Sequence, residues 1–331
     1  MLTRTSRALA VAAGPSLRAV ARTAARAYLS TGASPGPNPD PARFGRKDTA
    51  AGALFADAGQ ANAYAAYRPT YPPALYDAID AFAREAWAKT GAEGGAEPPM
   101  RLVFDIGCGT GQATKVLGER YPSARVVGTD VSAAQVAAAG ASPPNVEYTV
   151  ATAEGMDAAE GSVDLVTVAQ ALHWFQLDVF YAACRRALRP AGVLAVWGYE
   201  TPVFGQAAAD AVLVDLHDNV LGEHWAPGRW HIVNAYADLM PDPRTHPFAE
   251  VRRLQGSSSG IVCERAMPMP AIMGYLRSWS AYATLRREHP EREDPLVEVE
   301  ARFRAALGLA AEDDSTAVRI GFPIFLILMA N

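Results

Sequence analysis

The feature that most constrains this chain is a glycine-rich turn directly after a short apolar run. Residues 102–106 are Leu-Val-Phe-Asp-Ile, and glycine then occupies every second position, at Gly107, Gly109 and Gly111. A nearly continuous apolar run that ends at a glycine is typical of a buried parallel strand. Glycine has no Cβ, so the turn can be tight and a ligand can lie against the backbone. The pattern predicts a ligand-binding turn at the carboxyl edge of a parallel sheet.

Strand and helix patterns alternate from Arg101 to about residue 200. Strands are expected at 102–106, 125–129, 146–150, 163–169 and 193–197, and helices at 112–120, 133–139 and 177–189. Parallel strands need crossover connections, which are usually helices. The alternation therefore predicts the α/β fold class with a doubly wound sheet.

The pattern changes after Trp197. Residues 203–240 have a helical, aromatic-rich pattern, 249–254 and 322–329 are expected to be closing strands, and 273–285 and 295–307 are expected to be helices. We therefore expect one domain over 50–331, with a core at 100–200 and helical cap elements at 203–315 that cover the substrate.

The first 39 residues contain five arginines and no Asp or Glu. This acid-poor, Arg-containing composition is typical of an organellar transit peptide, and Arg26, Tyr28 and Ser30 resemble a mitochondrial processing site. We predict a transit peptide and linker over 1–40 and a mitochondrial location. A chloroplast signal or an alanine-rich disordered tail is the alternative.

Composition argues against several classes of function. The net charge is −5 and no run of Lys or Arg lies beyond the N-terminus, so the basic footprint of a nucleic-acid-binding protein is missing. The three cysteines form no CxxC pair, which argues against a disulfide framework or a zinc site. The apolar run at 325–330 is too short to span a bilayer. We expect a monomer that acts on a small molecule, with no metal, no nucleic acid and no membrane span.

Two nucleotide classes compete for the glycine turn. A dinucleotide fingerprint needs glycine or alanine at the sixth position from Gly107, where this chain has Gln112. Asp105 precedes the glycines and suits the ammonium of a methionine moiety better than a pyrophosphate. Asp130 ends the next strand, where a carboxylate accepts ribose hydroxyls. These residues favour S-adenosylmethionine over a nicotinamide cofactor. The alternative is a tight turn without a ligand.

Several segments resemble a known family. Residues 105–111, 128–130, 151–154 and 189–196 resemble class I S-adenosylmethionine-dependent methyltransferases with a type 11 domain. Residues 64–72, 170–175, 224–229 and 278–282 are similar to the trans-aconitate and cantharidin-resistance type methyltransferases of fungi and to related plant proteins. The resemblance implies a Rossmann-like sheet, mostly parallel, with an antiparallel last strand.

The resemblance also implies roles for individual residues. Asp105 and the glycine backbone would hold the amino-acid half of the donor, Asp130 the ribose, and Val131 the adenine. Many relatives carry Asp near position 152, where this chain has Thr152, so the Ala153 backbone or the Glu154 side chain is expected to take that contact. The predicted donor-binding residues are Asp105, Gly107, Gly109, Gly111, Asp130, Val131, Ala153, Glu154 and Gln170.

Methyl transfer from a sulfonium mainly needs proximity and alignment. A hydroxyl acceptor benefits from a general base, whereas a carboxylate acceptor needs none. His173 follows the fourth strand and is the candidate catalytic base, since its unperturbed pKa suits that role. The favoured alternative is that His173 and Trp174 position and pack the donor pocket.

The remaining candidates concern the acceptor and a lid. Tyr64, Arg68 and Tyr71 could cover the donor, with Arg68 pairing a carboxylate; the alternative is a helix that packs on the sheet edge. Trp174 and Trp225 are candidates for the acceptor pocket, although aromatic residues are more often core.

Four functions stay open. We expect a small-molecule methyltransferase with a carboxylate or hydroxyl acceptor. A methyltransferase of protein or RNA and a non-catalytic donor-binding protein of the organelle are alternatives. A nicotinamide dehydrogenase is the fourth, and Gln112 argues against it.

Overall fold

The computed structural model describes residues 70–91, 100–226 and 228–331. The predicted transit peptide at 1–40, the predicted domain start at residue 50, and the candidate lid residues Tyr64 and Arg68 lie outside the described residues.

The described residues form an eight-stranded sheet in the order β3-β2-β1-β4-β5-β8-β6, with β7 paired to β8. The strands are β1 (Leu102–Ile106), β2 (Arg125–Asp130), β3 (Val146–Val150), β4 (Val163–Ala169), β5 (Leu188–Tyr199), β6 (Glu250–Leu254), β7 (Val262–Met267) and β8 (Val318–Ala330). The pairings among β1 to β5 are parallel, and β8 is antiparallel to β5, β6 and β7. The predicted α/β class, mostly parallel with an antiparallel last strand, is confirmed.

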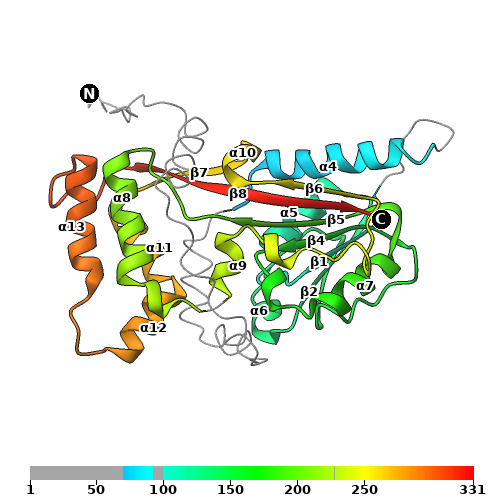
Figure 1. The fold of residues 1–331 in the computed structure, drawn as a ribbon, viewed down its shortest axis with the longest axis horizontal. Coiled ribbons are helices and arrows are strands. Elements are labelled where there is room, and N and C mark those ends of the chain that lie inside the picture. The colour runs from blue at the N-terminus through cyan, green and yellow to red at the C-terminus, as the bar shows by residue number, and fades with distance from the viewer. Residues whose placement is uncertain (1–69, 92–99, 227) are drawn as a thin grey trace, which may run out of the picture.

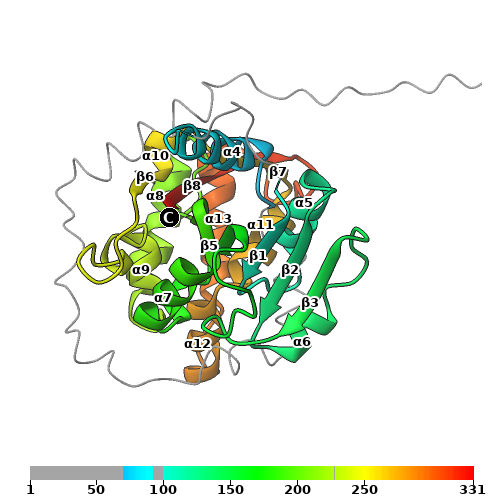
Figure 2. The ribbon, with the colours of Figure 1, turned by 90° about the vertical axis from the view of Figure 1, so that its right-hand side faces the viewer.

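Helices surround this sheet and extend it at one end. They are α4 (Pro73–Ala88), α5 (Gln112–Arg120), α6 (Ala133–Ala137), α7 (Leu177–Ala187), α8 (Ala207–Asp215), α9 (Arg229–Val233), α10 (Gly256–Ser259), α11 (Met269–Arg277), α12 (Ser280–Glu288) and α13 (Pro295–Leu307). Figure 1 shows α8, α11, α12 and α13 gathered at the left, away from the parallel strands at the right, with β8 running between the two parts. Figure 2 looks onto the parallel strands, with α4 above them and α7 below.

The central strands of the sheet are buried on both faces, which explains their continuous apolar runs. Successive side chains of a strand point to opposite faces. In β5, Trp197 packs into the core that includes α4, whereas Val196 packs into the core that includes α7. In β8, Leu326 likewise packs into the core that includes α4, and Phe325 packs into the core that includes α7.

Most of the predicted elements of the core are confirmed, with several shifted ends. β2 ends at Asp130 rather than at residue 129, α6 ends at Ala137 rather than at residue 139, and β5 spans Leu188–Tyr199 rather than 193–197. Ser132 caps α6, because its Oγ accepts from the Gln135 backbone N–H at 3.4 Å. Helix α7 ends at Ala187 rather than Arg189, since Leu188 already pairs with Val163 as the first residue of β5.

The cap differs more from the prediction. The helix expected at 273–285 is two helices, because the chain extends at Trp279, whose side chain is buried among Tyr275 and Trp225. Strand β7 was not predicted. It pairs with residues 318–323, so β8 begins at Val318 rather than at residue 322.

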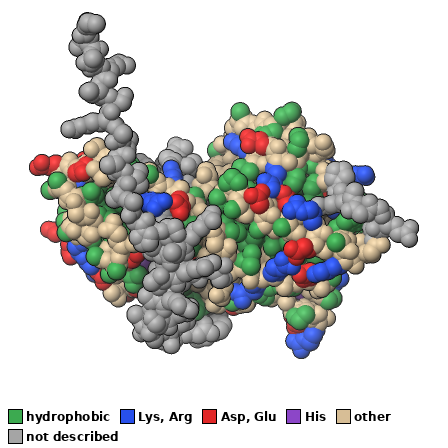
Figure 3. Space-filling model, turned by 90° about the horizontal axis from the view of Figure 1, so that it is seen from above, with side chains coloured by type: hydrophobic (Ala, Val, Ile, Leu, Met, Phe, Trp, Pro, Cys, Tyr) green, Lys and Arg blue, Asp and Glu red, His purple; other side chains and the backbone are tan. Residues whose placement is uncertain are grey.

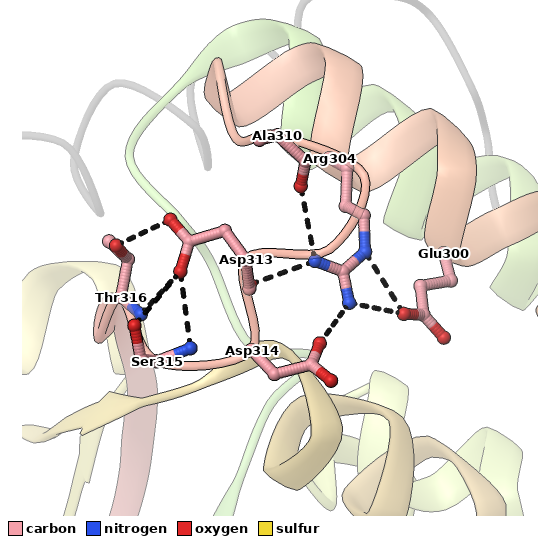
Figure 4. Close-up of polar contacts among 7 residues, drawn as sticks. All are labelled: Glu300, Arg304, Ala310, Asp313, Asp314, Ser315 and Thr316. Carbon is pink, nitrogen blue, oxygen red and sulfur yellow. Dashed lines mark hydrogen bonds and ion pairs between the residues drawn. The ribbon is translucent and has the colours of Figure 1, made fainter.

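A polar cluster fixes the connection between α13 and β8 (Figure 4). The buried Arg304 guanidinium donates to Glu300 at 2.6 Å, to Asp314 at 2.5 Å and to the Asp313 carbonyl at 2.8 Å. The Asp313 carboxylate accepts from the hydroxyl of Thr316 at 2.6 Å. These contacts close the cap and direct the chain into β8.

Charged side chains on the surface are mixed in sign. Figure 3 shows Lys and Arg interspersed with Asp and Glu on the face seen from above. The ion pairs Lys89–Glu250 at 2.5 Å and Arg252–Glu85 at 2.6 Å join α4 to β6. Within the described ranges, no helix combines the length and apolar character needed to cross a bilayer.

Candidate active site

A cavity of about 430 Å³ opens at the carboxyl ends of β1, β2 and β4. Strand order reverses at β1, which lies between β2 and β4, and ligands of open α/β sheets bind at such a point. The cavity is lined by Tyr71, Gly107, Cys108, Gly109, Thr110, Gln112, Ala113, Asp130, Val131, Ser132, Gln135, Ala151, Thr152, Ala153, Glu154, Ala169, Gln170, Ala171, Trp174, Phe175 and Gln176.

The glycine turn forms the floor of this cavity. Gly107 and Gly111 have φ values of 70° and 81°, which glycine adopts without strain. A Cβ on Gly107 would lie 2.6 Å from the Ala171 Cβ, and one on Gly111 would lie 2.2 Å from the Tyr148 hydroxyl. Gly107 and Gly109 line the cavity, whereas Gly111 is the N-cap of α5 and is not part of the lining. The donor contact predicted for Gly111 stays a prediction.

Asp130 connects the glycine turn to the end of β2. Its Oδ2 accepts from the Gly109 backbone N–H at 2.9 Å, and its Oδ1 accepts from that of Ser132 at 2.8 Å. A carboxylate has about four lone-pair sites, so both oxygens can also accept ribose hydroxyls. The neighbouring Val131 lines the cavity with 58% of its surface exposed, as a platform for a flat apolar ring would be.

Asp105 does not line the cavity. It is fully buried, and its oxygens accept from the hydroxyls of Thr114 at 2.6 Å and Thr167 at 2.7 Å. Burial raises the pKa of its carboxyl to about 6. The carboxylate thus joins β1 to α5 and β4 and supports the turn from behind. The predicted contact of Asp105 with a donor ammonium stays a prediction.

Gln170 directly follows β4 and has an unusual backbone conformation at the cavity. Its φ of 57° is rare for a residue other than glycine. Its Nε2 donates to the Tyr199 carbonyl at 3.4 Å, and its buried Oε1 has no hydrogen-bond partner among the described residues. Strained residues and unsatisfied acceptors each cost about 1–3 kcal/mol and concentrate at functional sites. Gln170 therefore combines backbone strain with a buried, unsatisfied acceptor in the lining of the cavity.

Ala153 and Glu154 both line the cavity beyond β3. The Glu154 Oε1 accepts from the Gln176 backbone N–H at 2.8 Å, just before α7. Glu154 therefore connects the loop after β3 to the loop after β4 across the cavity. Both residues lie where an adenine contact was predicted, and that contact stays a prediction.

His173 lies beside the cavity rather than in its lining. It belongs to a short 3₁₀ turn, Leu172–Trp174, and its Nδ1 is 2.7 Å from the Tyr236 hydroxyl. Burial, together with the charges of His231 and Arg229, lowers the pKa of its imidazole to about 3. An imidazole with that pKa is neutral at pH 7 and a weak base. The geometry therefore supports the packing and positioning interpretation of His173 and Trp174.

The aromatic candidates divide between the two parts of the molecule. Tyr71 and Trp174 line the cavity, and Tyr71 packs edge-on against Trp197 with centroids 5.4 Å apart. Trp225 does not line the cavity. It packs on Trp279 at 5.3 Å and donates to the His217 carbonyl at 2.9 Å.

Sequence reasoning missed part of the cavity lining. Phe175 and Gln176 follow β4 within seven residues, so their place after a strand end was the available signal. Gln135 reaches the cavity from α6, which no motif indicated. Among the described residues, no group of three His, Cys, Asp or Glu could hold a metal ion.

Comparisons with known proteins agree with this geometry. The methyltransferase-domain family matches residues 104–196. A protein of Dictyostelium discoideum named as a methyltransferase is 33% identical over 267 residues, which cover 80% of this chain and 90% of that protein. The trans-aconitate 2-methyltransferase of Deinococcus radiodurans is 41% identical over 102 residues, 30% of this chain and 38% of that protein. A solved type II methyltransferase structure from Anaeromyxobacter dehalogenans has a TM-score of 0.63 and 32% identity, and the match covers 79% of this chain and 97% of that one.

Proposed function

Because the chain belongs to the class I S-adenosylmethionine-dependent methyltransferases, we propose that it transfers the donor's methyl group to a carboxylate of a small organic acid. The observation that carries the acceptor class is the state of His173. The His173 imidazole lies beside the cavity, and its Nδ1 is hydrogen-bonded to the Tyr236 hydroxyl. Burial lowers the pKa of this imidazole to about 3. A hydroxyl acceptor benefits from a general base there, and a carboxylate acceptor needs none.

Residues at three strand ends would each bind a different part of the donor. Asp130 would bind the ribose and Val131 the adenine at β2, and the Gly107 and Gly109 backbone would hold the methionine portion at β1. Gln170 lines the cavity after β4, and its predicted contact would be with the same methionine portion. The donor supplies an activated methyl group, so the residues around it mainly bind, align and exclude water.

One relative supports an acidic acceptor. The Deinococcus radiodurans protein is named for trans-aconitate, a tricarboxylate, and its match covers 102 residues. Because that match spans 38% of that protein, it supports the class of acceptor and not the identity of the acid.

The test is transfer of a labelled methyl group to small acids. We expect the purified protein to form a product from which mild base releases the label as methanol, as esters do. Removal of the donor or competition by S-adenosylhomocysteine should abolish the product. Label found only in base-stable ethers or amines would contradict a carboxylate acceptor, and donor binding without any product would favour the non-catalytic alternative.

We also propose that the N-terminal segment directs the protein to mitochondria. The support is the five arginines and the absence of acids in residues 1–39. A fluorescent reporter fused to residues 1–45 should enter mitochondria. A chloroplast signal in plant cells, or a diffuse cytosolic signal, would contradict the proposal.

A further inference from the structure

Tyr236 has a backbone conformation that tyrosine rarely adopts. It lies between α9 and the 3₁₀ turn Ala237–Leu239, and its φ is 56°. The preceding residue, Ala235, also has a positive φ, of 48°. Positive φ values are unusual for residues other than glycine, and they persist only where the surrounding structure holds the backbone in place. Two such residues in succession make this segment a candidate functional feature.

The contacts around Tyr236 show what holds the segment. Its side chain is fully buried, and its ring packs edge-on against Phe325 of β8, with centroids 5.0 Å apart. Its backbone N–H donates to the His231 carbonyl of α9 at 2.8 Å. The Ala235 carbonyl accepts from Arg253 of β6 at 3.3 Å. The segment is therefore fixed to α9, β6 and β8, and the Tyr236 side chain packs in the core that includes α7.

The Tyr236 hydroxyl reaches the 3₁₀ turn that follows β4. The hydroxyl and Nδ1 of His173 share a hydrogen bond of 2.7 Å. The His173 imidazole in turn packs against the Trp174 ring, with centroids 4.8 Å apart. Trp174 lines the donor cavity and is 36% exposed. Direct contacts therefore connect Tyr236 to a wall of the cavity, although Tyr236 itself is not part of the lining.

The partly exposed Trp174 ring needs support if it is to form a fixed wall. An exposed side chain changes rotamer readily unless its neighbours restrain it. The His173 ring covers one side of Trp174, and the hydrogen bond to Tyr236 keeps the imidazole from rotating away. A binding site is well defined only when residues behind its lining lock the orientation of the lining side chains.

We propose that Tyr236 is a positioning residue for methyl transfer: acting through His173, it holds the Trp174 ring in place as a wall of the donor cavity. The inference rests on the proposed binding of the donor in this cavity and is independent of the class of acceptor. It involves no proton transfer, because the hydrogen bond only orients an imidazole that packs on another ring. Donor affinity should therefore depend on a hydroxyl that lies outside the lining.

The first test removes this hydroxyl alone. Tyr236→Phe keeps the ring against Phe325 but leaves the His173 imidazole free to turn. By calorimetry on the full-length protein, we expect the affinity for S-adenosylhomocysteine to fall about 5- to 10-fold, the factor that one neutral hydrogen bond contributes. Trp174→Ala, which removes the wall itself, should lower the affinity at least as much.

Tyr181→Phe is the matched control. Tyr181 is buried in the same core, and its hydroxyl donates to the Leu239 carbonyl at 2.7 Å. Each substitution removes one buried hydroxyl, so the melting temperature should fall by a similar amount in both variants. Only Tyr236→Phe should weaken binding of S-adenosylhomocysteine. An equal loss of affinity in the two variants would show a general effect of destabilisation and would overturn the inference.

A double variant tests whether Tyr236 acts through His173. In a His173→Phe background, Tyr236→Phe should lower the affinity no further, as expected for residues that act as a unit. A loss of affinity that persists in this background would mean that Tyr236 acts through another contact, and the proposed route would be wrong.

Fluorine NMR of protein labelled with fluorotryptophan follows the Trp174 ring itself. The Trp174 resonance can be assigned by its loss in Trp174→Phe. It should shift or broaden in Tyr236→Phe and stay unchanged in Tyr181→Phe, since only the first substitution releases the imidazole that packs on Trp174. An unchanged Trp174 resonance in Tyr236→Phe would contradict the positioning role.

The outcomes separate this inference from the proposed donor site. If Asp130→Asn lowers the affinity for S-adenosylhomocysteine and Tyr236→Phe does not, the inference is overturned and the cavity remains the donor site. If neither Asp130→Asn nor Trp174→Ala changes the affinity, the cavity is not the donor site, and this inference fails with that proposal.

Discussion

The donor cavity and the cap are built by different means. At the cavity, backbone groups of strand ends and glycine turns carry the geometry, as in the bonds from Gly109 and Ser132 to Asp130. In the cap, side chains from separate segments hold one another, as Trp225 packs on Trp279 and donates a hydrogen bond to the His217 carbonyl. The first arrangement is local in sequence, whereas the second depends on tertiary packing. Substitutions should therefore affect donor binding and cap stability separately.

The largest effect is expected at the glycine turn. Gly107→Ala places a Cβ 2.6 Å from Ala171 at a φ of 70°, so the floor of the cavity must shift. We expect donor affinity to fall by more than about 100-fold and the free energy of unfolding to fall by about 2–4 kcal/mol. Calorimetry with S-adenosylhomocysteine and urea unfolding measure the two quantities.

Gly161 is the control that separates the cost of backbone strain from the cost of the steric clash at Gly107. Gly161 has a φ of 64° but nothing within 4 Å of a Cβ. Gly161→Ala should cost only about 1 kcal/mol and leave donor affinity unchanged. Equal effects of the two substitutions would refute the collision at Gly107.

The next effect concerns the ribose end. Asp130→Asn keeps the shape but weakens two hydrogen bonds that its carboxylate accepts. Because charge-assisted bonds are about twice as strong as neutral ones, we expect donor affinity to fall about 10- to 100-fold while KM for the acceptor stays constant. Asp157→Asn at an exposed position is the control. A change in acceptor KM alone would contradict the division of the cavity.

The substitution Arg304→Met should destabilise the cap without loss of donor binding. Arg304→Met removes the contacts with Glu300, Asp314 and the Asp313 carbonyl (Figure 4). We expect the melting temperature to fall more than for Arg287→Met, and binding of S-adenosylhomocysteine to the remaining folded protein to be unchanged. Loss of donor binding at temperatures where the variant is folded would show that the donor cavity and the cap are coupled.

The smallest expected effect is on how stability depends on pH, where His173 and Asp105 should contribute in opposite directions. His173 has a pKa lowered to about 3, so the unfolded chain binds more protons between that pKa and the ordinary value of 6.5, and stability falls as pH falls through this window. Asp105 has a pKa raised to about 6 from 3.8, so its contribution falls as pH rises through that window.

These slopes can be measured by urea unfolding between pH 3.5 and 6.5. In the His173→Gln variant, the free energy of unfolding should fall less steeply as the pH is lowered, by at most the slope that one proton contributes. In the Asp105→Asn variant, the free energy of unfolding should fall more steeply as the pH is lowered. Slopes that change in the same direction in both variants would contradict one of the two assignments.

The elements of the fold that local sequence signals define could be predicted, whereas those that tertiary packing defines could not. The bounds of β1, β3, β4, α5 and α13 could be predicted because apolar runs, glycines and the Pro295 start are local signals. The break at Trp279 could not, since the burial of its side chain against Tyr275 and Trp225 decides the local conformation. β7 is defined by its pairing with β8, and no periodicity of its own reveals it.

The site was predicted to a similar degree. Asp130 and the cavity position of Gln170 could be predicted because each residue lies at or directly after a strand end. The burial of Asp105 could not, since it depends on Thr114 and Thr167 from two other elements. Gln135 was missed because it reaches the cavity from α6 and no motif indicated it.

The position of β8 has a consequence for how the protein is made. Its thirteen residues follow all three of its partners in the chain and pair with β5, β6 and β7. Until β8 emerges from the ribosome, β5 presents an open apolar edge, which is a template for misassembly. The nascent chain can therefore complete the pairing of β1 to β5 early, while the free edge of β5 stays unpaired until β8 is added.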